Sequence, residues 1–270
     1  MYLLHIPPRL GEWFRFAINI FCELYPSCCG LYNIQLTGDQ PIVMIQDNIQ
    51  AFIFDMDGTL VDNSDFHTQA WLTLLNGIGI EIDARELHRQ NAGKTNAETL
   101  RGILGDRLSE AEMQALARRK ENLYREAYRP NIQPIPGLIV FLDQARVMGI
   151  PMALATSAGQ QNISLVLDGL GIRDYFAVVV GADDIQNSKP NPEMFLTAAR
   201  RLGILPQSCV VLEDSPAGIE AARRAGMRTV VITTFLDPNE LHGEAGILQA
   251  VPDFTHLEAR RLIGSRDNSD

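Results

Sequence analysis

Five short apolar runs, each followed by a helical pattern, constrain the fold of this chain more than any other feature. The runs are rich in Val, Ile, Phe and Ala and end at small or polar residues, as the strands of β-α-β units do. They are apolar on both faces, which suits a parallel sheet covered by helices on each side. We therefore predict an α/β fold with a Rossmann-like parallel sheet sandwiched by helices. The runs cover residues 51–55, 151–156, 176–180, 209–213 and 228–232.

A long segment without a strand signal separates the first run from the second. Ser109 and Glu112 form a capping-box pattern, and the apolar positions after them predict a helix over 109–128. Helical patterns also cover 65–77 and 96–104. Because connections of this length usually carry function, we predict an inserted α-helical cap, which we assign to residues 63–133.

The predicted strands and cap determine how the remaining residues are assigned. The sheet layer is expected over 45–62 and 134–235, and a C-terminal segment, 236–270, is expected to pack on it. Residues 1–44 fit neither the strand nor the helix pattern. We expect them to be a poorly ordered extension, or a stretch translated from a start codon placed too early, with Met44 as the working start.

The charge balance excludes several classes of partner. The chain has 33 acidic and 23 basic residues and a formal net charge of -10, so no broad basic surface is available for nucleic acid or an anionic membrane. The apolar stretch 14–25 is too short and too charged to span a bilayer, and it makes a poor signal peptide. The four cysteines show no disulfide framework or zinc spacing. We expect a cytoplasmic protein that binds neither nucleic acid nor membranes.

The first candidate site follows the first strand. Asp55 and Asp57 are two residues apart, so in an extended segment both side chains point to the same side and can address one site. Two carboxylates so close repel each other unless a cation or a proton lies between them. Gly58 allows a sharp turn just after the pair. The alternative is a solvated acidic turn, which the motifs after the later strands make less attractive.

Two further motifs offer groups that bind anions. Thr156 and Ser157 follow the second run, where a hydroxyl and free N–H groups at a helix start can hold an anion. A plain helix cap by Ser157 is the alternative. Lys189, next to Pro190, follows the third run and is placed to hold a phosphate oxygen, although a lone lysine is ordinarily only solvated.

A fourth motif adds two adjacent carboxylates at the end of a buried strand. Glu213 and Asp214 would be costly there without a cation. With Asp55 and the carbonyl group of Asp57 they make an oxygen-rich site suited to Mg²⁺ and water. Ser215 and the proline after it are an ordinary helix start and need no other explanation.

The order of these motifs, Asp-x-Asp-Gly-Thr, Thr-Ser, Lys-Pro and Glu-Asp on successive strands, resembles that of the haloacid dehalogenase superfamily of phosphatases. The resemblance covers about residues 51–233. The insertion looks like the cap of the first subclass, subfamily IA, and is nearest to the beta-phosphoglucomutase-like enzymes. His67 and Trp71 in the first cap helix, and Lys120 and Tyr124 later in the cap, are similar to that branch.

The resemblance implies a Mg²⁺-dependent phosphatase acting on a small phosphorylated metabolite, with a sugar phosphate as the expected substrate class. Asp55 would be the nucleophile and form an aspartyl phosphate, and Asp57 would be the general acid and base, with Thr59 helping to orient it. Thr156 and Lys189 would hold the phosphoryl oxygens. The implied metal ligands are Asp55, Asp57, Glu213 and Asp214. The implied substrate-binding residues are Gly58, Thr59, Ser157, His67, Lys94, Asn96 and Lys120.

The cap sequence helps to distinguish a phosphatase from a mutase, which transfers a phosphoryl group within a sugar phosphate. The mutases of this branch carry a loop Gly-x-Ser-Arg-x-x-Ser whose arginine binds the far phosphate, and the matching stretch here is 93–99, with Asn96 in place of that arginine. Lys94 or Lys120 does not reproduce the bidentate guanidinium. We therefore favour hydrolysis, with a beta-phosphoglucomutase-type mutase as the alternative. For His67, a cap-hinge or proton-shuttle role and an ordinary exposed helix position are equally open.

Other reaction classes fit less well. The dehalogenases of the superfamily lack an aspartate two positions after the nucleophile, so Asp57 favours phosphate esters. A catalytically silent binding protein would have lost a motif carboxylate or lysine, and none is missing here. The expected partner is a small-molecule phosphate ester, and the expected state is a monomer or a weak homodimer.

Overall fold

The computed structural model divides the chain into two units, residues 1–48 and 49–270. In the first unit, strands β1 (Tyr32–Thr37) and β2 (Gln40–Ile45) form an antiparallel hairpin with Tyr32 opposite Ile45. The sequence did not indicate this hairpin, and the expected disorder or early start of this segment stays a prediction. The structure describes residues 32–37, 40–45, 49–84, 86–87, 95–241 and 245–263.

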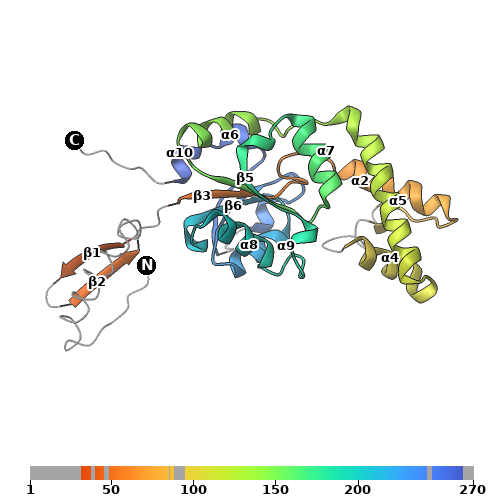
Figure 1. The fold of residues 1–270 in the computed structure, drawn as a ribbon, viewed down its shortest axis with the longest axis horizontal. Coiled ribbons are helices and arrows are strands. Elements are labelled where there is room, and N and C mark those ends of the chain that lie inside the picture. The colour runs from red at the N-terminus through yellow and green to blue at the C-terminus, as the bar shows by residue number, and fades with distance from the viewer. Residues whose placement is uncertain are drawn as a thin grey trace. The chain divides into compact units, whose positions relative to one another are not determined.

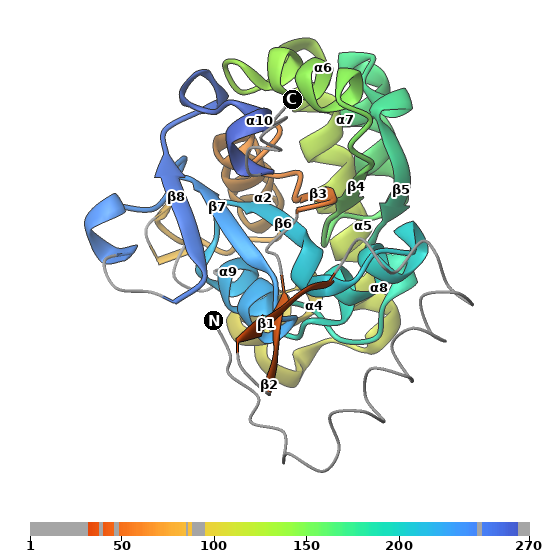
Figure 2. The ribbon, with the colours of Figure 1, turned by 90° about the vertical axis from the view of Figure 1, so that its left-hand side faces the viewer.

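The second unit is built on a six-stranded parallel sheet, in the order β5-β4-β3-β6-β7-β8 (Figures 1 and 2). The chain fills one half of the sheet with β3, β4 and β5 and then the other half with β6, β7 and β8, so the direction of winding reverses between β3 and β6. The predicted α/β fold is confirmed. The strands are β3 (Ala51–Phe54), β4 (Met152–Ala155), β5 (Phe176–Val180), β6 (Cys209–Glu213), β7 (Arg228–Ile232) and β8 (Ile247–Val251).

The edge strand β8 is the strand of this sheet that the sequence did not predict. Its middle residues Leu248 and Gln249 are exposed, whereas Val251 at its end is buried. A strand at an edge and open on one side lacks the continuous apolar run that marks the central strands of a parallel sheet. It lies within the C-terminal segment that we expected only to pack on the core.

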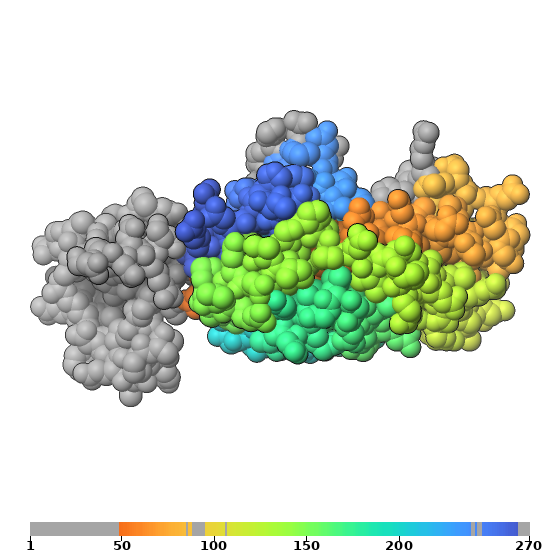
Figure 3. Space-filling view, turned by 90° about the horizontal axis from the view of Figure 1, so that it is seen from above, coloured from red at the N-terminus to blue at the C-terminus, as the bar shows by residue number. Residues whose placement is uncertain are grey.

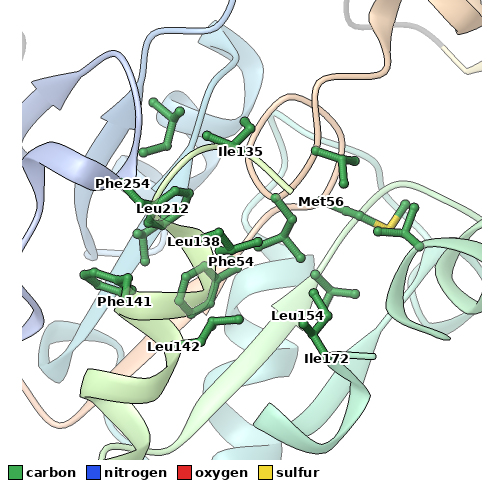
Figure 4. Packing of buried hydrophobic residues seen from close by; sticks show 14 of the residues in the cluster. Phe54, Met56, Ile135, Leu138, Phe141, Leu142, Leu154, Ile172, Leu212 and Phe254 are labelled. Atoms are coloured by element: carbon green, nitrogen blue, oxygen red, sulfur yellow. The ribbon is translucent and has the colours of Figure 1, made fainter. Parts of the chain in front are cut away.

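Alternation along the strands divides the core into two layers. Phe52 and Phe54 of β3 belong to a cluster with side chains of α6 (Leu138–Val147), α7 (Gln160–Leu170) and the short α10 (Ala259–Leu262). Figure 4 shows Phe54 at the centre of this layer, among Leu138, Phe141 and Leu154. Burial of these large side chains is the main source of stability for the sheet.

The opposite face of the sheet carries smaller side chains. Ala51 and Ile53 of β3 pack with residues of α8 (Glu193–Leu202) and α9 (Pro216–Arg224). In Figure 2, α8 and α9 lie on one side of the sheet and α6 and α10 on the other. The helices therefore sandwich the sheet, as predicted.

Between β3 and α6, the described part of the chain forms three α-helices that gather at one end of the second unit (Figure 1). They are α2 (Ser64–Gly77), α4 (Asn96–Leu104) and α5 (Glu110–Tyr128), each within one residue of the predicted ranges. Capping boxes start α4 at Thr95 and α5 at Ser109. Helices α2 and α5 pack against each other, and their orange and yellow-green surfaces adjoin in Figure 3.

The cap helices share a small apolar core of their own, made by Trp71, Leu74, Leu75, Leu87, Leu100 and Leu104. Short 3-10 helices cover Gly105–Arg107, Arg129–Asn131, Arg173–Tyr175, Ala182–Asp184, Pro206–Ser208, Pro238–Leu241 and Phe254–His256. Among the described residues, no helix combines the length and the apolar character that crossing a membrane requires.

Candidate active site

The candidate site lies at the carboxyl ends of β3 and β6. These two neighbouring strands flank the point where the winding of the sheet reverses, and in open α/β sheets ligands bind in the crevice at such a point. Asp55 follows β3 directly, and Glu213 ends β6. The position of both carboxylates is therefore set by the two innermost strands of the sheet.

The loop after β3 is tightly wound. The Asp55 N–H donates to the carbonyl of Leu212 on β6 at 3.0 Å, and Leu60 N–H donates to the carbonyl of Met56 at 2.8 Å. Gly58 has φ 83°, and a Cβ added there would lie 2.0 Å from Asp214 Oδ2. Glycine is required at this position both by the backbone conformation and by the close approach of Asp214.

A lysine bridges the two strand ends. Lys189 Nζ donates to Asp55 Oδ1 at 2.5 Å and to Glu213 Oε1 at 2.6 Å, and it lies 4.9 Å from the centre of the Phe195 ring. Burial by itself would lower the pKa of Lys189, but Asp55 and Glu213 raise it above its ordinary value. The lysine is therefore a fixed positive charge beside the proposed nucleophile.

Three buried carboxylates surround that charge. One oxygen from each of Asp55, Glu213 and Asp214 lies within 4.8 Å of the others. Burial raises the pKa of Asp55 to about 7 and the pKa of Asp214 well above its ordinary value, and the neighbouring carboxylates add to both shifts. Glu213 Oε2 accepts from the N–H groups of Asp214 and Ser215 at 2.7 and 2.6 Å, so this carboxylate is fixed by backbone donors.

This donor set fits a divalent cation. The charge of Glu213 helps to raise the pKa of Asp55 and of Asp214, because one lysine does not compensate the carboxylates, and a bound cation relieves this condition. An all-oxygen set suits Mg²⁺ better than a transition metal that prefers nitrogen or sulfur ligands. The hydroxyl of Thr59 donates to Asp214 Oδ1 at 3.1 Å, so in this structure Thr59 orients Asp214 rather than Asp57.

The segment after β4 supplies the predicted anion-binding groups. Thr156 is buried, its N–H donates to the carbonyl of Val180, and its Oγ1 accepts from the N–H of Ala158 at 3.1 Å. Ser157 is exposed, and helix α7 has Gly159 as its N-cap with no side-chain cap bond. The alternative of Ser157 as a plain helix cap is therefore wrong.

Asp57 points to the cap side of the site. Its Oδ1 accepts from Asn63 Nδ2 at 2.6 Å, and the same amide donates to the hydroxyl oxygen of Tyr124 at 2.7 Å. Burial raises the pKa of Asp57, while the hydrogen bond from Asn63 opposes that rise. A carboxyl group held in this way retains a proton more readily than an exposed aspartate, as a general acid must.

His67 stands over the same region. Its ring stacks on the ring of Tyr124 with the centres 3.8 Å apart, and its Nε2 lies 3.9 Å from Asp57 Oδ2. Burial, together with the positive charge of Lys120, lowers the pKa of His67 to about 3. Lys120 Nζ lies 2.7 Å from Nδ1, and because an ammonium group only donates, Nδ1 accepts and Nε2 carries the hydrogen. An ordinary exposed helix position for His67 is therefore excluded.

Two of the remaining predicted cap residues contact the same carboxylate. Lys120 and Asn96 meet at Glu121: Lys120 Nζ and Asn96 Nδ2 both donate to its Oε1, each at 2.8 Å. Asn162 of α7 donates to its Oε2 at 2.6 Å, which joins the cap to the core. Lys94 lies outside the described residues.

Four residues at the site received no role from the sequence. Asn63 and Tyr124 hold Asp57 and His67, and Glu121 and Asn162 connect the cap cluster to the core. Tyr124 and Asn63 could have been found from the sequence, because they lie beside recognised motifs. No sequence pattern pointed to Glu121 or Asn162. A glutamate among arginines and lysines is common on an exposed helix surface, and so is an asparagine in the first turn of a helix.

The comparisons with known proteins agree with this geometry. A model of the haloacid dehalogenase-like hydrolase family matches residues 52–232, more than half of the chain. The chain belongs to the haloacid dehalogenase-like hydrolase family. This confirms the resemblance drawn from the four strand-end motifs.

Relatives of this haloacid dehalogenase-like hydrolase include both phosphatases and mutases. Fructose-1-phosphate phosphatase YqaB from Escherichia coli is 35% identical over 180 residues, which cover 67% of this chain and 94% of the relative. Beta-phosphoglucomutase from Bacillus subtilis is 33% identical, covering 67% and 82%. The crystal structure of beta-phosphoglucomutase from Clostridium difficile superposes with a TM-score of 0.70 at 31% identity, covering 79% of this chain and 95% of that one.

Proposed function

We propose that this hydrolase is a Mg²⁺-dependent phosphatase that removes phosphate from a small phosphorylated metabolite, with sugar monophosphates as the substrate class. One observation carries the proposal: Lys189 lies between Asp55 and Glu213, with Asp214 in the same cluster, at the switch point of the sheet. This arrangement supports a nucleophilic role for Asp55, beside a fixed cation and a carboxylate pair suited to a metal. The phosphatases among the relatives support the same reaction.

The proposed chemistry has two displacements. An oxygen of Asp55 attacks phosphorus, the bond from phosphorus to the ester oxygen breaks, and Asp57 gives its proton to the leaving oxygen. Asp57 then takes a proton from a water molecule that attacks the aspartyl phosphate and restores Asp55. Two lower barriers replace one high barrier. Lys189 and Thr156 hold the phosphoryl oxygens in both steps.

Asp55, Asp214 and the carbonyl group of Asp57 would hold Mg²⁺, with Glu213 nearby. When bound, the ion neutralises charge on the phosphoryl oxygens. His67 Nε2–H, a buried donor with no hydrogen-bond partner among the described residues, faces Asp57 and is available to the oxygen that Asp57 protonates.

Hydrolysis is proposed over mutase chemistry because of the cap. Asn96, in the place of the mutase arginine, directs its amide to Glu121 and carries no charge for a second phosphate. A beta-phosphoglucomutase-type reaction is the second candidate, because enzymes of that name are among the relatives. A silent binding protein is less well supported, since Asp55, Glu213, Asp214 and Lys189 lie together. A cytoplasmic location and a monomeric or weakly dimeric state stay predictions from sequence.

The test is phosphate release from a panel of sugar monophosphates with added Mg²⁺, by the wild type and by Asp55→Asn. We expect the variant to lose at least about 10³-fold in kcat because the nucleophile is removed. Asp65→Asn, a change at an exposed aspartate on α2, is the control and should keep full activity. Near-normal turnover by Asp55→Asn would refute the covalent route. Glucose 6-phosphate formed from glucose 1-phosphate only with a bisphosphate primer would favour the mutase.

A further inference from the structure

The cap carries a charge pair beside the proposed general acid. Lys120 is 3% exposed in its side chain and bonds to Glu121, whose side chain is 21% exposed. The two charges cancel, and His67, the third ionisable member of the group, is held neutral. These three described residues together therefore carry no net positive charge.

Glu121 is held firmly but keeps one acceptor position. Its Oε1 accepts from Lys120 and Asn96, and its Oε2 accepts from Asn162. A carboxylate offers about four acceptor positions, so the described residues leave one of them open on a side chain that solvent still reaches. A neutral hydroxyl group of a substrate can donate to that position, whereas a phosphate or carboxylate group of a substrate cannot.

The charge of Glu121 also reaches the reaction centre. Burial alone would raise its pKa, but the charge of Lys120 and the hydrogen bonds from Lys120 and Asn162 lower it to about 2, so the group is ionised at neutral pH. Its negative charge is one of the influences that raise the pKa of Asp57. The same negative charge would repel an anionic group of the substrate other than the scissile phosphate.

We propose that Glu121 is a specificity-determining residue, which selects phosphate esters whose remaining part is neutral and hydroxylated and rejects esters with a second anionic group. The proposal rests on the phosphatase function above. Asn96, in place of the mutase arginine, already argues against binding of a second phosphate. We assign the rejection of substrates with a second phosphate to Glu121. A like charge placed at a binding site is strongly unfavourable, whereas a hydroxyl group that donates to a carboxylate is favourable.

The experiment compares two substrates that differ only in a distal phosphate: fructose 1-phosphate and fructose 1,6-bisphosphate. The measured quantity is the ratio of their kcat/KM values, from initial rates of phosphate release with saturating Mg²⁺. The variants are Glu121→Gln, which removes the charge but keeps the shape, and Glu126→Gln, the same change on the exposed side of α5. Circular dichroism checks that each variant is folded.

We expect the wild type to favour the monophosphate by at least about tenfold. Glu121→Gln should bring that ratio down by a comparable factor, and Glu126→Gln should leave it unchanged. A purely structural role of Glu121 would lower both kcat/KM values together without changing the ratio, and that result would overturn the proposal. A wild-type ratio near one would overturn it as well.

Two further observations keep the test decisive. If Glu121→Gln does not fold, the wild type is assayed at rising salt concentration, where screening of the repulsion should lower the ratio and a constant ratio counts against the proposal. If the wild type releases no phosphate from any ester in the panel, the proposed function itself fails. Phosphate release with a selectivity that does not depend on Glu121 leaves the function standing and refutes only this inference.

Discussion

The site has two polar clusters that differ in charge and in the elements that hold them. The core cluster, Asp55, Lys189, Glu213 and Asp214, follows parallel strands and has three carboxylates for one lysine. The cap cluster, His67, Lys120 and Glu121, stands on helices α2 and α5 and has one carboxylate for one lysine. Asn162 at the start of α7 joins the cap cluster to the core.

If the proposed function and the proposed role of Glu121 hold, this difference separates reaction from selection. A cluster with excess negative charge needs a cation, and a cation with a nucleophilic carboxylate is what phosphoryl transfer requires whatever the rest of the substrate is. By our proposal, the neutral cluster of the cap does not attract phosphate. It is suited to recognising what is attached to the phosphate.

After the loss of the nucleophile Asp55, the largest effect is expected from removing the lysine of the core cluster. Lys189→Met should lower kcat by about 10²–10³-fold, because a fixed positive charge is lost from the phosphoryl site. Without Mg²⁺, the variant should also lose about 3–5 kcal/mol of unfolding free energy, because buried carboxylates are left without their partner. Phosphate release and urea denaturation measure the two effects.

Added Mg²⁺ should restore part of the stability of Lys189→Met, since the cation compensates the same carboxylates. Arg200→Met, a change at an exposed position of α8, is the control for losing a surface charge. If Lys189→Met were as stable as the wild type in the absence of metal, the core cluster would not depend on this lysine.

The second effect concerns the turn at the core cluster. Gly58→Ala should lower kcat/KM by at least about tenfold, because its new methyl group displaces the Asp214 carboxylate that lies 2.0 Å from the ideal Cβ position. Gly79→Ala is a matched control, since Gly79 has a similar φ of 78° but no atom within 4 Å of its Cβ position.

Both glycine variants should lose about 1–2 kcal/mol of stability from the strained backbone, which thermal or urea unfolding measures. Only Gly58→Ala should lose activity. Equal activity losses would show that backbone strain, and not the contact with Asp214, is what matters at this turn.

The core cluster was predictable from strand topology, whereas in the cap cluster His67 and Lys120 were named only through the family resemblance and Glu121 was not named. Strand ends bring residues together by topology, so Asp55 and Glu213 could be placed in one site from two sequence runs alone. The cap depends on how α2, α5 and α7 pack, and no spacing rule places Asn162 within reach of Glu121. The edge strand β8 was missed because its middle residues are exposed. The hydroxyl of Thr59 was assigned to Asp57 but bonds to Asp214.

A smaller effect is expected where the two clusters are joined. Asn162→Ala removes the hydrogen bonds to Glu121 Oε2 and from Arg125 Nη1, at 2.6 and 2.8 Å. We expect KM to rise several-fold with a smaller change in kcat, because the cap is held less firmly while the core cluster is intact. Loss of about 1 kcal/mol of stability should accompany it.

Gln161→Ala, a change at the exposed neighbour on α7, should leave both kinetic constants unchanged. A fall in kcat equal to that of Lys189→Met would contradict the separation of reaction from selection, since Asn162 does not touch the core cluster.

The smallest effect is a pH dependence of stability that belongs to the cap. The pKa of His67 is about 3 in the folded protein and about 6.5 when the chain is unfolded, so between these values the unfolded state binds the extra proton. Stability from this group is therefore present above pH 6.5 and is lost as the pH falls toward 3, by about 1.4 kcal/mol per pH unit at most. The raised pKa values of Asp55 and Asp57 change the stability in the opposite direction. The pH dependence of wild-type stability therefore contains contributions from both clusters.

Comparison with His67→Gln isolates the cap contribution, because glutamine keeps polar groups but does not titrate. Urea unfolding at several pH values between 7 and 5, without Mg²⁺, should show a stability difference between wild type and variant that shrinks as the pH falls. A difference that stays constant over this range would show that His67 is protonated to the same extent in the folded and the unfolded chain. The neutral charge balance of the cap cluster would then be wrong, and with it the contrast between a cluster that needs a cation and one that does not.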